Sequence, residues 1–229
     1  MRLDDAALEL AINPEPRCPC VLVLDVSGSM GEGNAIGELN EGLRVFREAL
    51  SSDAQAQNRV QLAVLTFGGE RDVTLVQDFV DARGFQAPSL RAGGVTPMGA
   101  AIIEALRLVE DRKALYRENG VSYYRPWIFF ITDGEPTAGD PWQEAARQVH
   151  EAEEQRRVSF FAIGVKDANL DVLAQIAPPE RPPLTLEGLK FQELFVWLSQ
   201  SMAAVTADTL QPGIQTALPP TTGWGRVRR

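Results

Sequence analysis

Short apolar segments that alternate with amphipathic ones constrain the fold of this chain more than any other feature of its sequence. Residues 20–25 (CVLVLD) and 127–132 (WIFFIT) carry large apolar side chains at consecutive positions, as do strands that are buried on both faces of a parallel sheet. Residues 36–51 instead place their large apolar side chains at spacings of three and four, as on one face of a helix. Strands that alternate with helices predict an α/β fold with a mostly parallel sheet.

The same pattern along the chain predicts six strands and five helices. We expect strands at residues 20–25, 60–67, 73–80, 127–132, 158–165 and 184–186. We expect helices near residues 36–51, 97–115, 141–156, 169–176 and 191–207. Segment 73–80 alternates polar and apolar residues, and we expect it to be an antiparallel edge strand. The predicted architecture is a Rossmann-like three-layer sandwich around a six-stranded, mostly parallel sheet.

The length of 229 residues favours one large domain, which we place at residues 17–210, after an N-terminal extension at 1–16. Residues 211–229 are rich in Pro, Gly and Thr and too poor in apolar residues to order themselves, so we expect a disordered basic tail. Removal of this tail is expected to leave stability nearly unchanged. Trp224 within it leaves two alternatives open, a hook for a partner or packing against the domain itself.

Charge and composition exclude several classes of function. The net charge of −9 disfavours nucleic-acid binding because such a surface repels phosphates. No apolar run approaches the ~20 residues that span a bilayer, and the first ten residues lack the apolar region of a signal peptide. Cys18 and Cys20 are too few to staple this chain, and we expect two small buried thiols rather than a redox or soft-metal site. These features predict a reducing, cytoplasmic location without membrane binding.

Three oxygen-bearing side chains follow the first predicted strand at alternate positions: Asp25, Ser27 and Ser29, in the order DVSGS. In an extended segment residues two apart point the same way, so all three can face one point. Gly28 between the serines lets the backbone bend so that the hydroxyls converge. Oxygen ligands of this kind suit Mg²⁺, Mn²⁺ or Ca²⁺ rather than zinc or copper.

Two further oxygen-bearing residues support the metal hypothesis. Asp133 ends the predicted strand at 127–132, and Thr96 lies in the glycine-rich loop GGVTPMG before a predicted helix. In open α/β sheets ligands bind outside the carboxyl ends of the strands, where the strand order reverses. If the strands at 20–25 and 127–132 are neighbours across that reversal, Asp25 and Asp133 face each other and Thr96 completes the site.

These motifs resemble a known family. DVSGSM, GGVTPMG with Thr96, and ITDG resemble the von Willebrand factor A (VWA) family and its metal-ion-dependent adhesion site (MIDAS). The segments NGVSYYRPWIFFITDGEPT and LKFQELFVWLSQSM are similar to the TerY-like proteins, a bacterial branch associated with tellurium resistance. The resemblance covers roughly residues 17–207 and implies the VWA fold.

The resemblance implies one Mg²⁺ site. The residues that match Ser27, Ser29 and Thr96 coordinate the ion in this family, and those that match Asp25 and Asp133 act through water or orient the serines. Neutral hydroxyls leave most of the ion's charge uncompensated, so a partner protein's Asp or Glu becomes the missing ligand. The implied function is a non-catalytic adaptor in a cytoplasmic stress response to tellurite, metals or phage, beside a protein kinase or a PP2C-type phosphatase.

The alternative class is a metal-dependent hydrolase or phosphatase that uses Asp25 or Asp133 with a metal-bound water. The sequence lacks a second set of acidic ligands, and its one histidine, His150, is expected on the solvated face of a helix. Nucleotide binding by GSMGEGNAIG is not expected, because Asn34 and Ala35 stand where a phosphate-binding loop needs Lys and Ser or Thr.

Two clusters are assigned to structure rather than to function. We expect the aromatic residues Tyr123, Tyr124 and Trp127, which precede or begin a strand, to lie in the core rather than on a partner-facing patch. We expect the charged run at residues 151–157 (EAEEQRR) to form an exposed helix face.

Overall fold

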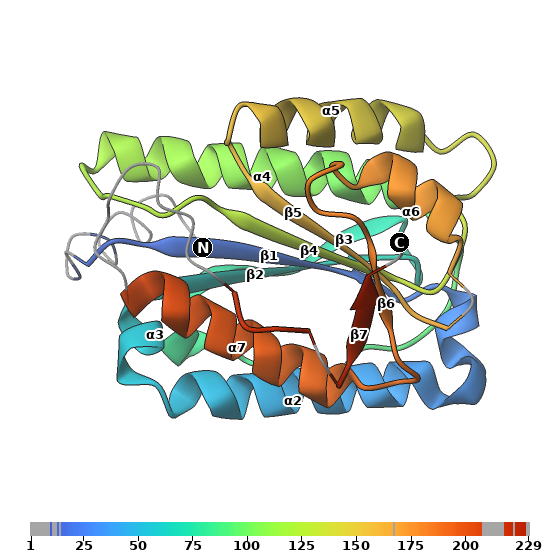
Figure 1. Cartoon of the computed structure of the whole chain (residues 1–229), viewed down its shortest axis with the longest axis horizontal. Coiled ribbons are helices and arrows are strands. Elements are labelled where there is room, and N and C mark those ends of the chain that lie inside the picture. Colours follow the sequence, from blue (N-terminus) through green and yellow to red (C-terminus); the bar gives the residue numbers. More distant parts are fainter. Residues whose placement is uncertain are drawn as a thin grey trace.

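The computed structural model is a three-layer sandwich with one seven-stranded sheet between two layers of helices (Figure 1). It describes residues 10, 13, 15–166, 168–207, 218–221 and 223–227, without the side chains of 205–207 and 227. The strands are β1 (Cys18–Asp25), β2 (Val60–Phe67), β3 (Val73–Asp81), β4 (Trp127–Thr132), β5 (Ser159–Gly164), β6 (Leu184–Leu186) and β7 (Gly225–Val227). The helices are α2 (Ala35–Ser51), α3 (Ala54–Arg59), α4 (Met98–Glu118), α5 (Trp142–Glu154), α6 (Leu170–Ile176) and α7 (Phe191–Ala207), with 3-10 segments η1 (Gly28–Asn34) and η2 (Ala82–Gly84).

The strand order is β3-β2-β1-β4-β5-β6-β7, so the order reverses between β1 and β4. β1 pairs in parallel with both β2 and β4. In the β1–β4 pair the register runs from Cys20 opposite Trp127 to Leu24 opposite Ile131. The carboxyl ends of these two strands therefore lie side by side at the reversal, which is the neighbour relation that the metal hypothesis assumed.

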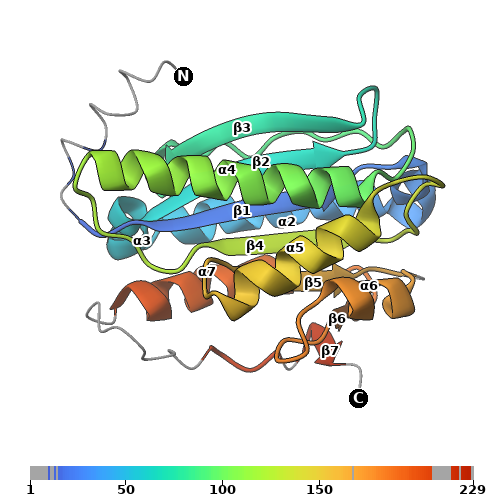
Figure 2. The same ribbon diagram turned by 90° about the horizontal axis from the view of Figure 1, so that it is seen from above.

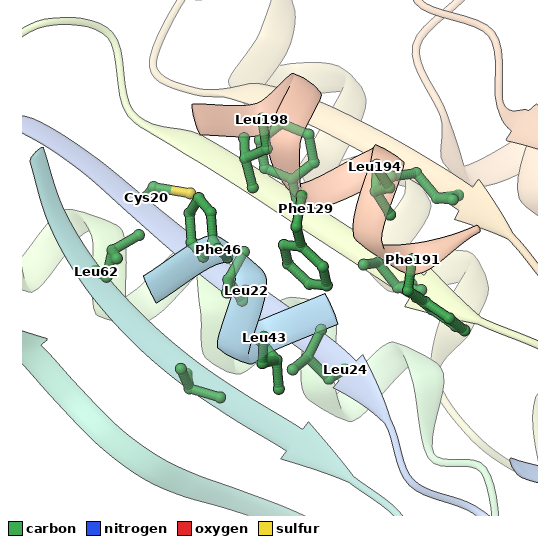
Figure 3. Packing of buried hydrophobic residues seen from close by; sticks show 14 of the residues in the cluster. Cys20, Leu22, Leu24, Leu43, Phe46, Leu62, Phe129, Phe191, Leu194 and Leu198 are labelled. Atoms are coloured by element: carbon green, nitrogen blue, oxygen red, sulfur yellow. The ribbon is translucent and has the colours of Figure 1, made fainter. Parts of the chain in front are cut away.

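The core forms on both faces of the sheet, because successive side chains of a strand point to opposite faces. Leu22 and Leu24 of β1 pack in the cluster that α2 and α7 cover, whereas Val21 and Val23 pack in the cluster beneath α4 and α5. Figure 3 shows the first cluster, where Phe129 of β4 lies close to side chains of α7. Figure 2 shows α4 and α5 lying across the opposite face.

The predicted fold class is confirmed, and all six predicted strands and five predicted helices are present. β3 pairs antiparallel with β2 at one edge, as expected. The sequence did not predict α3, whose six residues begin after Asp53. The carboxylate of Asp53 accepts hydrogen bonds from the backbone N–H groups of Gln55 and Ala56, which satisfies two donors that the first helical turn leaves unpaired.

The C-terminal end differs from the expected tail, and the sheet has seven strands instead of six. Residues 225–227 form β7, which pairs antiparallel with β6 at the second edge of the sheet. Trp224 is 3% exposed, and its ring lies 5.1 Å from that of Trp197 of α7. The prediction of a disordered tail is therefore wrong for residues 223–227, and the alternative in which Trp224 packs on its own domain holds. Residues 211–217, 222, 228 and 229 lie outside the described residues, as does most of the expected extension at 1–16.

Several expectations about single residues are confirmed. Cys18 and Cys20 are free, fully buried thiols, and burial raises the pKa of Cys18 to about 12. Tyr124 and Trp127 lie in the core as expected, whereas the expectation is wrong for Tyr123, which is only half-buried.

In the described part of the chain, no helix has the length and apolar character needed to cross a bilayer.

Candidate metal centre

Three loops meet at the carboxyl ends of β1 and β4: the loop after β1, the loop that contains Thr96, and the loop after β4. Backbone hydrogen bonds join the first two of these loops. The loop after β1 contacts residues 93–94 through Gly93 N to Val26 O (2.8 Å) and Gly28 N to Gly94 O (3.2 Å). These contacts place the loop that contains Thr96 beside the loop that contains the two serines.

Glycines make this close approach possible. Gly94 has φ 73°, and a side chain there would meet the carbonyl oxygen of Gly69 at 2.2 Å. Gly68 has φ 96°, and a side chain there would meet the backbone nitrogen of Ser27 at 2.7 Å. Positive φ and such contacts are accessible to glycine alone without strain, so the glycines fix how closely the loops pack.

The carboxylate of Asp25 is held at both oxygens. Its Oδ1 accepts a hydrogen bond from the backbone N–H of Ser27 at 2.7 Å. Its Oδ2 accepts one from the hydroxyl of Thr132, the last residue of β4, at 2.5 Å. The orientation of Asp25 is therefore fixed by one group of the loop after β1 and one group of β4.

The two serines connect Asp25 to Asp133. Ser27 Oγ lies 3.1 Å from Ser29 Oγ, and the Ser29 hydroxyl donates to Asp133 Oδ1 at 2.7 Å. A chain of hydrogen-bonded groups thus runs from the end of β1 to the end of β4.

Thr96 closes the site from the third loop. A methyl group built on Gly134 would lie 3.5 Å from Thr96 Oγ1 and 3.8 Å from Asp25 Oδ2, so both oxygens lie beside the same glycine. Two hydrogen bonds fix the Thr96 backbone to the loop after β4, from Thr96 N to Thr137 Oγ1 (2.9 Å) and from Thr137 N to Thr96 O (3.0 Å). The structure brings all five predicted residues together.

The site combines buried carboxylates with an exposed rim. Asp25 is fully buried and Asp133 is 7% exposed, whereas Gly28 and Val95 on the rim are exposed. Burial raises the pKa of Asp25, and hydrogen bonds from Ser27 and Thr132 offset part of that rise. A nearby cation would stabilise these buried negative charges.

The donor set fits a hard divalent ion. It consists of hydroxyl and carboxylate oxygens, the ligands that Mg²⁺ and Ca²⁺ prefer. Among the described residues no group of three or more His, Cys, Asp or Glu side chains could hold a metal.

Two residues that contact the site, Thr132 and Lys166, were not predicted from the sequence. Thr132 is fully buried, and the only signal for it is its place directly before Asp133 in ITDG. Lys166 follows β5, and its ammonium lies 3.5 Å from Asp133 Oδ2; the signal for it is a lysine just beyond a strand that neighbours β4. His150 is exposed on α5, as predicted, and its ring Nε2 lies 3.1 Å from the carbonyl oxygen of Ala177.

Solved structures with this fold include proximal thread matrix protein 1 from the mussel byssus, at 19% identity and a TM-score of 0.58 over 83% of this chain and 49% of that one. A second structure of that protein, with a zinc-occupied MIDAS motif, matches at 18% identity and a TM-score of 0.57 over the same shares of the two chains. The pilus adhesin SpaC from Lactobacillus rhamnosus GG, in its open conformation, matches at 15% identity and a TM-score of 0.66 over 85% of this chain and 31% of that one.

These likenesses show the fold, and this chain spans about half of the mussel protein and about a third of the adhesin. A search of curated proteins found no significant match. The family model for the von Willebrand factor type A domain matches residues 20–194. This chain therefore belongs to the von Willebrand factor A family.

Proposed function

We propose that this chain is a Mg²⁺-dependent protein-binding module whose adhesion site takes an Asp or Glu side chain of a partner. The observation that carries the proposal is the set of hydrogen bonds that joins Asp25 to the backbone N–H of Ser27, the Ser27 hydroxyl to Ser29, and Ser29 to Asp133, with Thr96 beside them. Ser27, Ser29 and Thr96 would hold the ion, and Asp25 and Asp133 would act through water or by orienting the serines.

The hydrogen bonds give each group a defined role. Ser29 donates its proton to Asp133 and accepts a hydrogen bond from the Ser27 hydroxyl, which leaves one lone pair of its oxygen available to a cation. Asp25 is fixed by Ser27 and Thr132, so its negative charge stays in place without a partner. When bound, the ion supplies a positive centre that attracts a carboxylate more strongly than a neutral amide.

The rim of the site supports binding to a large partner. Val95 is 50% exposed and directly precedes Thr96, so an apolar side chain lies next to a proposed ligand. An apolar contact beside the charged one would add specificity, because a partner would have to fit Val95 as well as supply a carboxylate. VWA domains generally bind protein partners, and this chain has the fold of that family.

The pathway proposal is more specific. The likeness of residues 119–137 and 189–202 to TerY-like proteins supports a role as an adaptor for a protein kinase or a PP2C-type phosphatase, in resistance to tellurite or defence against phage. The free thiols of Cys18 and Cys20 support a reducing, cytoplasmic location.

Binding rather than catalysis is the proposed output. His150 is the one histidine of the sequence, and its ring contacts the carbonyl of Ala177. Acid–base chemistry at the site would therefore depend on Asp25, Asp133 or Lys166. The second candidate remains a metal-dependent hydrolase that uses Asp25 or Asp133 with a metal-bound water.

The test uses the purified full chain as bait in native lysate, with Mg²⁺ or with chelator, beside Thr96→Ala. A partner captured only with Mg²⁺, and lost with Thr96→Ala, is then purified, and its interface Asp or Glu residues are replaced by the amides. Loss of binding in one amide variant would support the proposal. Mg²⁺-dependent hydrolysis of a phosphoester panel that Thr96→Ala abolishes would establish the hydrolase instead.

A further inference from the structure

One positive charge lies inside the candidate metal centre. Lys166 follows β5, the neighbour of β4, and its ammonium lies 3.5 Å from Asp133 Oδ2. The same group donates hydrogen bonds to the carbonyl oxygens of Ser29 at 3.0 Å and of Glu32 at 2.6 Å. The ammonium therefore makes two hydrogen bonds and one ion pair with oxygens in or beside the site.

The backbone at Lys166 shows that this placement has a cost. Its φ is 50°, in the left-handed region that disfavours any residue with a side chain other than Asn or Asp. Such a conformation persists where the surrounding contacts hold it. The side chain is only 23% exposed, so water screens its charge incompletely.

We propose that Lys166 is an internal cation that competes with the divalent ion for Asp133 and thereby sets the metal affinity of the site. The inference rests on the proposed function, because it assumes that Asp133 helps to bind the ion. The ammonium already offsets the charge of Asp133, and its repulsion of a second cation is strong at short range in a partly buried place. A carboxylate from a partner would restore the missing negative charge, so metal and partner would bind cooperatively.

The first test is calorimetric titration of the full chain with MgCl₂ at fixed ionic strength. Lys166→Met removes the charge and keeps an unbranched side chain, and we expect it to bind Mg²⁺ about tenfold more tightly than the wild type. Lys166→Arg keeps the charge and should stay close to the wild type. Arg44→Met removes a positive charge from an exposed site on α2, where the side chain is 64% exposed, and should leave Mg²⁺ affinity unchanged.

A second measurement separates competition from a general structural effect. In chelator, Lys166→Met should melt below the wild type, because Asp133 loses its ion pair, yet Mg²⁺ should raise its melting temperature by more. In an Asp133→Asn background the ammonium has no carboxylate to compete for and only its direct repulsion of the ion remains, so Lys166→Met should raise Mg²⁺ affinity by clearly less than in the wild-type background. This double-mutant cycle assigns the effect to the Lys166–Asp133 pair.

Unchanged or weaker Mg²⁺ binding by Lys166→Met would overturn the inference, since the ammonium would then only hold η1 in place. Tight Mg²⁺ binding by the wild type in that same experiment would leave the proposed metal site intact. If the wild type binds no Mg²⁺ and Lys166→Met does, the ammonium of Lys166 prevents Mg²⁺ binding in the wild type, and the inference is supported. If neither binds, both the metal site and the inference fail.

Discussion

Ser29 Oγ donates a 2.7 Å hydrogen bond to Asp133 Oδ1 and so joins two residues that are 104 positions apart in the sequence. The contact exists because β1 and β4 are neighbours in the sheet and because each residue follows the carboxyl end of its strand. The Ser29 proton therefore points to Asp133, the Ser27 hydroxyl donates to Ser29, and one lone pair of Ser29 can face a cation. The candidate metal site therefore depends on the strand order as much as on the residues of the DVSGS and ITDG motifs.

The role of Asp25 can be tested without unfolding the domain. Asp25→Asn should abolish measurable Mg²⁺ binding in calorimetry, because the ion loses a buried negative charge beside it. In the variant the amide oxygen can still accept from Ser27, and the amide nitrogen can donate to the Thr132 hydroxyl, so the contacts around position 25 are kept. We expect circular dichroism to show a native fold and a melting temperature in chelator at or above that of the wild type, since burial of a charge is costly.

Undiminished Mg²⁺ binding by Asp25→Asn would place the ion elsewhere. A variant that fails to fold would show that the Asp25 charge is needed for the domain itself. Thr96→Ala is the matched second variant, because it removes one expected ligand and leaves the charge of the site unchanged.

The C-terminal strand should contribute to stability. The indole N–H of Trp197 donates to the carbonyl of Pro219 at 2.7 Å, and Glu187 N donates to the carbonyl of Trp224 at 2.8 Å. Trp224→Ala removes a buried ring at the sheet edge, and we expect a loss of about 2–4 kcal/mol. This corresponds to a fall in melting temperature of roughly 5–15 °C by calorimetry.

Arg226→Ala is the control, because its side chain is 79% exposed and pairs with Glu187, and such surface pairs contribute about 1 kcal/mol or less. Truncation after Gln211 should cost at least as much as Trp224→Ala, contrary to the expectation from the sequence. An unchanged melting temperature in the truncated chain would mean that β7 and Trp224 do not stabilise the domain.

The two cysteines should be inert in the folded protein. Burial raises the pKa of Cys18 to about 12 and also raises that of Cys20, so neither thiol ionises at pH 8. We expect a thiol reagent to label both cysteines rapidly in denaturant and neither within the same time in the native state. Because the pKa of Cys18 is raised in the folded state, the stability that this buried neutral thiol contributes is fully present below the ordinary thiol pKa. It falls as the pH rises towards 12. Rapid labelling of one thiol in the native protein would contradict the burial.

The sequence predicted the strands well because their pattern reflects burial on both faces. The predicted ranges 60–67 and 127–132 match β2 and β4 at both ends. The positions of Asp25 and Asp133 could be predicted for a related reason, since residues at the ends of neighbouring parallel strands must lie close together. Only the neighbour relation itself had to be assumed.

Other features depend on contacts that no local pattern encodes. β7 has three residues and no periodicity, and it forms because β6 presents a free edge to it. Lys166 carries no motif, and two of its three partners are backbone carbonyls. The run at residues 151–157 was predicted to form an exposed helix face. This prediction is wrong for Ala152, which is buried, and for Glu153, whose side chain is 9% exposed, and α5 ends at Glu154 before the last three residues of the run.

Glu153 joins three segments that are distant in sequence. Its carboxylate pairs with Arg125, which precedes β4, and with Arg181, which follows α6. Its Oε1 also accepts a hydrogen bond from the backbone N–H of Phe160 in β5 at 2.5 Å. The guanidinium of Arg181 in turn lies 4.7 Å from the centre of the Phe161 ring. One carboxylate at the end of α5 therefore forms ion pairs with two arginines and a hydrogen bond with the backbone of β5.

Glu153→Ala should destabilise the domain more than substitutions of most other residues near its surface. It leaves two arginines without their carboxylate and one strand N–H without its acceptor, and each such loss is costly when the group is shielded from water. The arginine side chains are 25% and 27% exposed, so water offsets part of the loss. We expect the free energy of unfolding, measured with denaturant, to fall by about 2–3 kcal/mol. Glu154→Ala, the exposed neighbour on the same helix, should change the free energy of unfolding by less than about 0.5 kcal/mol. Equal losses of unfolding free energy in the two variants would mean that the Glu153 contacts contribute nothing to stability. Glu153 would then behave like an exposed residue, as the sequence predicted.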